Sequence, residues 1–371
     1  MSRVRRFIES VAQEMDVNIN GDRPWDIQVH EPQFFYRVAQ EGSVGLGVSY
    51  MDGWWDCAAL DEFFFRVFRA QIPQRLMKDK FQKWLLFWSK YMNFQSKRRA
   101  REVAHVHYDL GNDLYSAMLD SRMVYSCGYW KTAKDLEEAQ IHKLDLVCKK
   151  VGLKKGERVL DIGCGWGSFA KFAAENYGVE VVGVTVSIQQ KAMAEKRCQG
   201  LPIEIRLQDY RDLNEKFDRI ISIGMFEHVG HKNYREYMKV AARCLKEEGL
   251  FCLHTIGQDV STYAADPWVD RYIFPNGMIP SLQQLSRAAE GLFIMEDWHN
   301  FGQYYDLTLM AWWDNFKAAS PALKHKYGDR FYRMWEYYLK MFAGTFRARE
   351  LQLWQIVFSK QGLVSGYQSI R

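Results

Sequence analysis

The sequence lacks any window of about 18 consecutive apolar residues, the length that a transmembrane helix needs. Its first 15 residues include basic side chains but no apolar run behind them, so they do not form a secretory signal. Among 371 residues there are 8 prolines and 7 cysteines, and no two cysteines form a C-x-x-C pair. These scarcities exclude a collagen-like chain and argue against a disulfide framework or a zinc site. We therefore expect a cytoplasmic protein that holds no metal.

The composition is that of a large globular protein. A length of 371 residues suggests two domains, because about 150 residues per domain is usual. Hydrophobic residues make up 48% of the chain and charged residues 26%, which allows a large core. Aromatic residues reach 15%. That content fits either an aromatic core or a site that handles acyl chains, and composition alone favours the core.

The net charge of +5 conceals one strongly basic segment, residues 71–101. It holds nine Lys and Arg side chains against one acid, so the rest of the chain is net negative. Such a block is typical of a solvated face, a nucleic-acid patch or a surface that meets an anionic membrane. Within it, apolar residues recur at helical spacing: Met77, Phe81, Trp84, Leu85, Trp88 and Met92. The stripe predicts an amphipathic helix, either at a membrane interface or packed in an ordinary domain core.

The chain changes character near residue 100. We expect a small, mainly helical domain over 1–95, a basic linker over 96–104 and a second domain over 105–371. In the second domain, apolar runs alternate with helical stretches; the runs span 158–163, 179–187, 203–208, 217–225, 249–257, 292–298 and 351–360. Strands separated by helices are typical of a parallel sheet covered on both faces. The sequence thus predicts an α/β fold with a seven-stranded, mostly parallel, Rossmann-like sheet and an aromatic helical insertion over 305–347.

The first of these strands runs into the sequence VLDIGCGWGSF, a glycine-rich strand-to-helix turn that includes Asp161, Gly163, Gly165 and Gly167. Glycines there let the backbone approach a ligand, and the next helix offers free N–H groups. A dinucleotide-binding turn would read G-x-G-x-x-G, with an acidic residue ending the second strand, where this chain has Thr185. The spacing instead resembles the first motif of Rossmann-like methyltransferases that use S-adenosylmethionine.

Further segments narrow the resemblance. They are HYDLGNDLYSAMLDSRMVYSCGYW (107–130), GMFEHVGHKNY (224–234), LHTIG (253–257), DPWVDRYIFPNGMIPS (266–281) and EDWHNFGQYYDLTLMAW (296–312). Together with VLDIGCGWG and GVTVS, they closely resemble the cyclopropane-fatty-acyl-phospholipid synthase family. The resemblance covers about 105–360 and extends to the N-terminal domain, which the related mycolic acid methyltransferases largely lack.

The resemblance implies transfer of the sulfonium methyl of S-adenosylmethionine to a cis double bond of an unsaturated acyl chain in a membrane phospholipid. Attack by the alkene leaves a carbocation on the acyl chain, and a base must then remove a proton so that a cyclopropane ring closes. Aromatic faces stabilise such a cation by about 0.5–2 kcal/mol each. The candidates are Tyr263, Trp268, Tyr272, Phe274 and Trp312, each of which also fits plain core packing.

For the base, the resemblance implies a bound bicarbonate ion. The matching cage comprises the backbone at Cys127 and Ile256 and the side chains of Glu227, His254 and Tyr305. N–H groups, imidazole and phenol can donate to the anion, while Glu227 can accept the bicarbonate proton. Alternatives remain for three of them: His254 also fits a core histidine, Glu227 a helix first-turn acid, and Tyr304 adjoins Tyr305. The mechanism needs no thiol, so Cys127 is assigned a backbone role.

The cofactor contacts carry over in the same way. The resemblance places Tyr125 and Ser126 at the methionine or sulfonium end, and Gly163 and Gly165 at the amino-acid portion beside Asp161. Thr185 and Gln190 stand where other methyltransferases often hold the ribose. Asp209 and Tyr210 are expected to flank the adenine.

Two alternative functions stay open. One is a C-methyltransferase that leaves a methyl or methylene branch on a lipid, which the mass and hydrogenation behaviour of the product would distinguish. The other is a nucleic-acid methyltransferase using the basic segment, but no recognisable RNA-binding motif supports it. We therefore expect no nucleic-acid partner, an enzyme peripheral to the inner face of the cell membrane and, from the resemblance, a homodimer.

The basic segment yields a test. Each Lys or Arg near an anionic membrane contributes about 1 kcal/mol of attraction, which falls off within a Debye length. We expect the triple substitution of Lys80, Lys83 and Lys90 by Glu to weaken co-sedimentation with anionic vesicles, and rising salt to weaken wild-type binding. Activity on detergent-dispersed substrate should survive. Equal pelleting of the triple variant and the wild type would exclude this segment as the membrane contact.

Overall fold

The computed structural model describes residues 3–71 and 111–371, which fall into two compact units. Among the described residues, the helical unit comprises 3–71, 264–275 and 305–351, and the sheet unit comprises 111–263, 276–304 and 352–371. The predicted linker at 96–104 and nearly all of the basic segment lie outside the described residues. The domain boundary there stays a prediction.

The helical unit joins N-terminal helices to later ones. Its elements are α1 (Arg3–Glu14), β1 (Gln28–Val29), α2 (Phe34–Glu41), α3 (Ser43–Met51), β2 (Trp55–Asp56), α4 (Leu60–Arg69), α13 (Pro267–Tyr272), α15 (Gln303–Ala318), α16 (Ser320–Tyr327) and α17 (Asp329–Arg347). Helix α17 lies close against α4, because a Cβ on Gly344 would come within 2.5 Å of the Asp61 carbonyl. The buried ring of Tyr337 packs against Phe64 and Trp268, at centroid distances of 5.0 and 4.5 Å. The N-terminal helices therefore share one aromatic core with α13 and α17.

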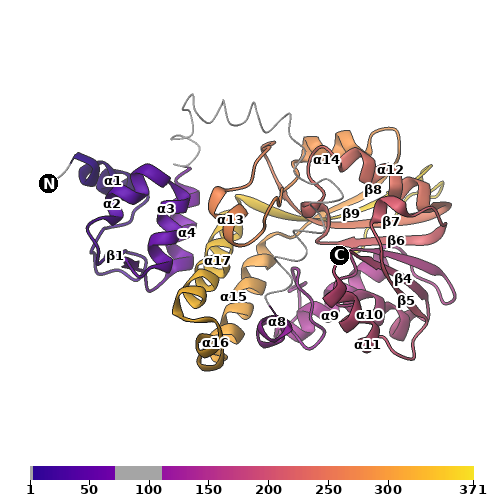
Figure 1. The fold of residues 1–371 in the computed structure, drawn as a ribbon. Helices are drawn as coiled ribbons and strands as arrows, with labels where there is room; N and C mark the ends of the chain where they lie inside the picture. The colour runs from indigo at the N-terminus through magenta and orange to yellow at the C-terminus, as the bar shows by residue number, and fades with distance from the viewer. Residues whose placement is uncertain (1–2, 72–110) are drawn as a thin grey trace. The chain divides into compact units, whose positions relative to one another are not determined.

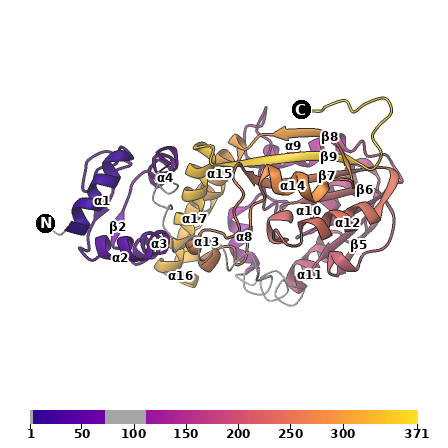
Figure 2. The ribbon, with the colours of Figure 1, turned by 90° about the horizontal axis from the view of Figure 1, so that it is seen from above.

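The sheet unit confirms the predicted fold class. Its elements are α8 (Asn112–Met118), α9 (Leu136–Lys150), β3 (Arg158–Ile162), α10 (Ser168–Tyr177), β4 (Glu180–Thr185), α11 (Ile188–Arg197), β5 (Ile203–Leu207), η1 (Tyr210–Asp212), β6 (Phe217–Ile223), η2 (Phe226–His228), α12 (Tyr234–Cys244), β7 (Leu245–Gln258), α14 (Leu282–Ala289), β8 (Ile294–Asn300) and β9 (Leu351–Ser359). The strand order is β5-β4-β3-β6-β7-β9-β8. Strands β3 to β7 pair in parallel, whereas β8 pairs antiparallel to β9 at the sheet edge (Figure 2).

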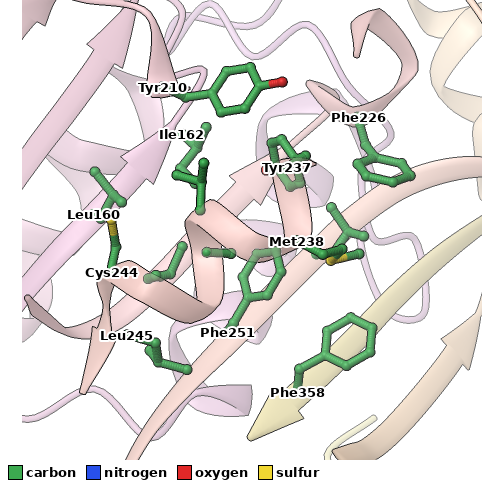
Figure 3. Close-up of a cluster of buried hydrophobic side chains, with 14 of the residues drawn as sticks. Leu160, Ile162, Tyr210, Phe226, Tyr237, Met238, Cys244, Leu245, Phe251 and Phe358 are labelled. Atoms are coloured by element: carbon green, nitrogen blue, oxygen red, sulfur yellow. The ribbon is translucent and has the colours of Figure 1, made fainter. Parts of the chain in front are cut away.

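Successive side chains of each strand point to opposite faces of the sheet, so a hydrophobic core forms on each face. Leu160 and Ile162 of β3 join the cluster drawn in Figure 3, which includes Tyr237 and Met238 of α12. Val159 joins the opposite cluster, with residues of α9 and α10. Figure 1 shows α12 and α14 on one side of the sheet and α9 and α10 on the other. Burial on both faces explains why the strands read as continuous apolar runs.

Most predicted element bounds agree with the structure to within a few residues, but β7 begins at Leu245 rather than at 249. The extra residues include Lys246 and two glutamates, a polar stretch that reads as a turn in the sequence. In the structure it continues the strand, because Leu245 pairs with Phe217 across a register shift in β6. Tertiary pairing has overridden local propensity here.

Helix ends follow local capping signals. The Asp135 carboxylate accepts from the Glu138 N–H at the start of α9, and the Ser187 hydroxyl accepts from the Gln190 N–H at the start of α11. Ser281 and Gln284 form a reciprocal capping box on α14. Such caps are worth roughly 1 kcal/mol each. In the described ranges, no helix is both long and apolar enough to cross a bilayer.

A buried ionic cluster joins α9, β8 and the last residues. The Lys150 ammonium, fully buried, lies 3.4 Å from an Asp297 carboxylate oxygen. The same carboxylate accepts two hydrogen bonds from the Arg371 guanidinium, at 2.6 and 2.7 Å, and one from the Ser369 hydroxyl. Desolvation alone would raise the pKa of Asp297, but the bonds from Arg371 and Ser369 and the charge of Lys150 hold it at about 2.

We expect Asp297→Asn to lower the free energy of unfolding by about 3 kcal/mol, because it leaves the Lys150 ammonium buried without a counter-charge. The control Asp329→Asn removes an exposed partner of Lys324 and should change stability by less than about 0.5 kcal/mol. Chemical denaturation measures both. Since the folded pKa of Asp297 lies below the ordinary value, the stabilisation exists above about pH 4 and declines toward pH 2. An Asp297→Asn effect that is constant down to pH 2 would contradict this assignment.

Candidate active site

The glycine-rich turn lies at the carboxyl end of β3. Two of its positions require glycine for different structural reasons. Gly163 has φ +84°, and a Cβ there would lie 2.8 Å from the Cβ of Met225. Gly165 has φ +54°, but a Cβ there would meet no atom within 4 Å. Both conformations are left-handed and favour glycine. Gly163 is therefore required by packing, whereas Gly165 leaves open space into which a ligand can approach.

A buried polar group lies next to this turn. Asp161, the last but one residue of β3, is buried, and its Oδ2 has no hydrogen-bond partner among the described residues. Desolvation raises its pKa to about 7 against the lowering effect of Lys143. On α9, the fully buried Lys143 ammonium donates to the Ser126 hydroxyl at 2.8 Å, and the Gln140 amide donates to the Ser126 carbonyl at 2.8 Å. Helix α9 thus holds the loop that contains Ser126.

The ends of the next two strands supply more of the predicted cofactor contacts. The Thr185 hydroxyl donates to Gln190 Oε1 at 2.9 Å, and both side chains are buried. The Asp209 carboxylate accepts two hydrogen bonds from the Arg211 guanidinium, at 2.7 and 2.8 Å. Tyr210 lies in the core cluster of Figure 3. Carboxyl ends of parallel strands meet at one edge of a sheet, the usual place for a ligand in this architecture. The roles of these residues toward a cofactor stay predictions.

Tyr125 and Cys127 flank Ser126 in the same loop. The Tyr125 ring packs edge-on against Tyr115, at 5.2 Å, and Tyr115 in turn contacts Trp166 of the glycine turn at 4.9 Å. Cys127 is fully buried, with its thiol directed to the Gly128 carbonyl at 3.2 Å. Tyr115 thus links Tyr125 to the glycine-rich turn, and the Cys127 thiol is occupied locally.

Glu227 lies in η2, just beyond the carboxyl end of β6. Its Oε1 accepts the Ile256 N–H at 2.6 Å, while Oε2 is buried without a hydrogen-bond partner in the described part of the chain. Desolvation raises its pKa to about 7, against the lowering effect of the Ile256 N–H. The Ile256 N–H therefore serves Glu227 here, and its place in an anion cage stays a prediction.

His254 lies on β7, two residues before Ile256 and therefore on the same strand face. Its Nδ1 is 3.2 Å from the amide nitrogen of Gln355 on β9, and its Nε2 is buried with no partner within residues 3–71 and 111–371. Desolvation, with the charges of Lys143 and Lys150, holds its pKa well below the usual 6.5. The imidazole is neutral at physiological pH. The two unpartnered atoms, Glu227 Oε2 and His254 Nε2, are therefore a potential acceptor and a potential donor for a ligand.

Tyr305 belongs to the helical unit, where its ring stacks on Phe346 at 4.4 Å and meets Trp312 at 6.1 Å. Its neighbour Tyr304 belongs to the sheet unit and packs edge-on against Tyr129 at 5.5 Å. The two tyrosines therefore have different surroundings. The predicted choice of Tyr305 over Tyr304 as a cage residue stays a prediction.

The aromatic residues predicted to stabilise the cation are also divided between the two units. Tyr263 contacts His231 in the sheet unit, and the residue is 37% exposed. In the helical unit, Trp268 and Trp312 are almost fully buried, and the indole N–H of Trp268 has no hydrogen-bond partner among the described atoms. Phe274 packs against Tyr338 at 5.7 Å. Buried packing partners support the core interpretation for Trp268 and Phe274.

Sequence reasoning missed three polar residues that support the site: Gln140, Lys143 and Gln355. A signal existed on α9, where Gln140 and Lys143 fall on the same helical face as Leu136, Leu144 and Val147. Gln355 is an isolated polar residue within the apolar run LQLWQIVF. No local pattern indicates its partner, because His254 lies about a hundred residues earlier in the chain.

Comparison with known proteins gives consistent results. Residues 95–356 match the family described as mycolic acid cyclopropane synthetase. The cyclopropane-fatty-acyl-phospholipid synthase of Escherichia coli strain K12 is 54% identical over 369 residues, which is 99% of this chain and 96% of that protein. A probable fatty acid methyltransferase of Pseudomonas putida is 32% identical over 359 residues, 90% of this chain and 86% of that protein. The solved structure of mycolic acid cyclopropane synthase CmaA1 complexed with SAH and CTAB has a TM-score of 0.66 and 30% identity, covering 70% of this chain and 98% of that one.

The open space at Gly165 can be tested. We expect Gly165→Val to weaken S-adenosylmethionine binding at least tenfold in calorimetry, because the branched side chain enters the ligand's space. The matched control is Gly156→Val, in the turn before β3, which has φ +81° and equally open surroundings. Both variants should lose a similar ~1–2 kcal/mol of stability through strain. Equal binding by both variants would place the cofactor elsewhere.

Proposed function

The chain belongs to the mycolic acid cyclopropane synthetase family, and on this premise we propose that it is a cyclopropane-fatty-acyl-phospholipid synthase. It transfers the methyl of S-adenosylmethionine to the cis double bond of an unsaturated acyl chain in a phospholipid and closes a cyclopropane ring. The observation that carries this proposal is the near full-length likeness to the Escherichia coli synthase. The alignment with that synthase covers 99% of this chain.

The sheet unit supplies the groups that hold the cofactor. When bound, S-adenosylmethionine supplies an electrophilic methyl, and the acyl double bond is its nucleophile. Gly165 leaves room for the backbone to meet the ligand, and the unpartnered Asp161 Oδ2 offers an acceptor beside that room. Lys143 and Gln140 fix Ser126 through two hydrogen bonds. These residues bind and orient the cofactor, with the contacts of Thr185, Gln190, Asp209 and Tyr210 assigned by family resemblance.

The residues at the ends of β6 and β7 fit a bound bicarbonate ion, the base that ring closure needs. A neutral imidazole N–H at His254 Nε2 can donate, and Glu227 Oε2 can accept a proton from the ion's hydroxyl. Leaving both groups buried and unpaired would cost about 1–3 kcal/mol each. A small ligand with one acceptor and one donor relieves both costs. Cys127, Ile256 and Tyr305 complete the proposed cage by resemblance.

A second candidate function is a C-methyltransferase that leaves a methyl or methylene branch on the lipid. It is favoured by the likeness to a protein described as a probable fatty acid methyltransferase. It would use the same cofactor-binding residues, but the carbocation would lose its proton without closing a ring. The presence of both Glu227 and His254 at the proposed base site supports the ring-forming reaction, and the product decides between the two.

We also propose that the enzyme works as a homodimer at the inner, anionic face of the cell membrane, where its substrate lies. The support is the charge of the basic segment, residues 71–101, which holds nine basic side chains and one acid. A lipid-modifying enzyme must meet a bilayer, and basic residues beside tryptophans are typical of an interfacial segment.

The proposed function is tested on vesicles of unsaturated phospholipid with labelled S-adenosylmethionine. We expect the label in fatty acids that gain one CH2 and resist hydrogenation under conditions that reduce alkenes. Glu227→Gln should lower turnover at least tenfold, because the amide oxygen takes the Ile256 N–H and leaves an NH2 donor where Oε2 would accept from the bound anion, while cofactor affinity stays nearly unchanged. Added bicarbonate should partly restore turnover.

The matched control is Glu296→Gln on β8, where the carboxylate accepts from Ser359 and Leu363 and lies outside the proposed site. It should keep wild-type turnover. A branched product that hydrogenation leaves as a saturated methyl chain would favour the second function. Loss of cofactor affinity together with turnover in Glu227→Gln would show that Glu227 is structural.

A further inference from the structure

Gln355 is a buried amide that the proposed reaction does not use directly. It lies on β9, which neighbours β7 in the sheet, and its side chain is fully buried. Its amide nitrogen is 3.2 Å from His254 Nδ1, while its Oε1 has no hydrogen-bond partner in the described ranges. A polar side chain held inside an apolar strand at the cost of an unpaired oxygen calls for an explanation.

The chemistry of the pair determines where the imidazole proton lies. An amide nitrogen only donates hydrogen bonds, so His254 Nδ1 must act as the acceptor. In a neutral imidazole, the other nitrogen then carries the proton. The ring is neutral because burial and the nearby Lys143 and Lys150 charges oppose its protonation. Gln355 therefore selects the Nε2–H tautomer.

That tautomer matters because Nε2 is the ring atom left unpartnered. In the opposite tautomer, Nε2 would be a lone-pair acceptor and would repel an oxyanion. The carboxylate of Glu227, whose Oε2 is also unpartnered, already provides an acceptor at the same strand end. Without the Nε2–H, the two side chains at this strand end would present two acceptors and no donor to an anion.

We propose that Gln355 is a positioning residue that fixes His254 as the neutral Nε2–H tautomer and so presents an N–H donor to the anion at the base site. The identity of the anion as bicarbonate rests on the proposed function. The tautomer assignment rests on the contact between Gln355 and a buried, neutral His254, and it does not depend on which anion binds.

The first test reads the tautomer directly in the full-length protein. The chain has 9 histidines, so 15N labelling of histidine gives a small set of ring signals, and His254→Gln assigns the signal of interest. In the wild type without bicarbonate, we expect His254 Nε2 to have the shift of a protonated ring nitrogen and Nδ1 that of an unprotonated one. The reverse pattern, or a doubly protonated ring at neutral pH, overturns the proposal.

The second test removes the amide. Gln355→Met keeps the length of the side chain but lacks the donor, so both tautomers of His254 should become populated. The affinity for bicarbonate, followed by the Nε2 shift, should fall roughly threefold to tenfold, the effect of about one neutral hydrogen bond. The control is Gln352→Met on the same strand, which loses side-chain bonds to Asn300 and Asp259 but should keep the wild-type tautomer and affinity.

The outcomes separate the two proposals. A wild-type Nε2–H signal that does not respond to bicarbonate overturns bicarbonate as the ligand and leaves the tautomer assignment intact. A Gln355→Met protein that keeps a single Nε2–H tautomer and full affinity overturns the role of Gln355. If Gln355→Met does not fold, the wild-type ring shifts alone still decide the tautomer.

Discussion

Two hydrogen bonds from α9 to Ser126 are the constraint on which the proposed cofactor site depends. The loop between α8 and α9 has no regular structure, yet it must hold side chains beside the glycine-rich turn. Helix α9 packs on the sheet, and Lys143 and Gln140 extend that rigidity to the loop. A fully buried ammonium is expensive unless it is hydrogen-bonded and near opposite charge. Asp120 and Asp161 supply that charge, and burial still lowers the pKa of Lys143 to about 8. Polar side chains of the loop, of α9 and of the end of β3 thus form one connected network.

The parallel sheet explains how chemically different groups come to one edge. Asp161, Thr185 and Glu227 lie at or just beyond the ends of three neighbouring strands of the sheet, and each is largely buried. Because the strands are apolar on both faces, their ends are the places where polar side chains can be held without disrupting the core. The dry surroundings then perturb each group: the pKa of Asp161 and of Glu227 rises to about 7, and that of His254 falls. Burial at the ends of the parallel strands therefore determines both where the polar groups lie and how their pKa values shift.

The sequence predicts local features well and tertiary pairings poorly. The strand runs, the helix caps and the glycine-rich turn follow from patterns within a few residues, and the fold class was predictable from them. No local pattern indicates that the Ile256 N–H bonds Glu227, 29 residues earlier in the chain, and the place of this N–H in an anion cage stays a prediction. Asp209 is engaged by Arg211, two residues away, which its spacing could have indicated. Lys143 and Gln355 acquire meaning only through partners distant in the chain, which no local pattern encodes.

Burial also affects the reactivity of the cysteine thiols in this chain. All seven cysteines are free and buried, and Cys164 lies within the glycine-rich turn itself. Its side chain packs over Gly183 of β4, where a Cβ would lie 3.0 Å from the sulfur, and burial raises its pKa well above the usual value. Only a thiolate is a strong nucleophile toward an alkylating sulfonium. Burial therefore keeps the Cys164 sulfur a weakly nucleophilic thiol inside the turn that we propose meets the methyl donor.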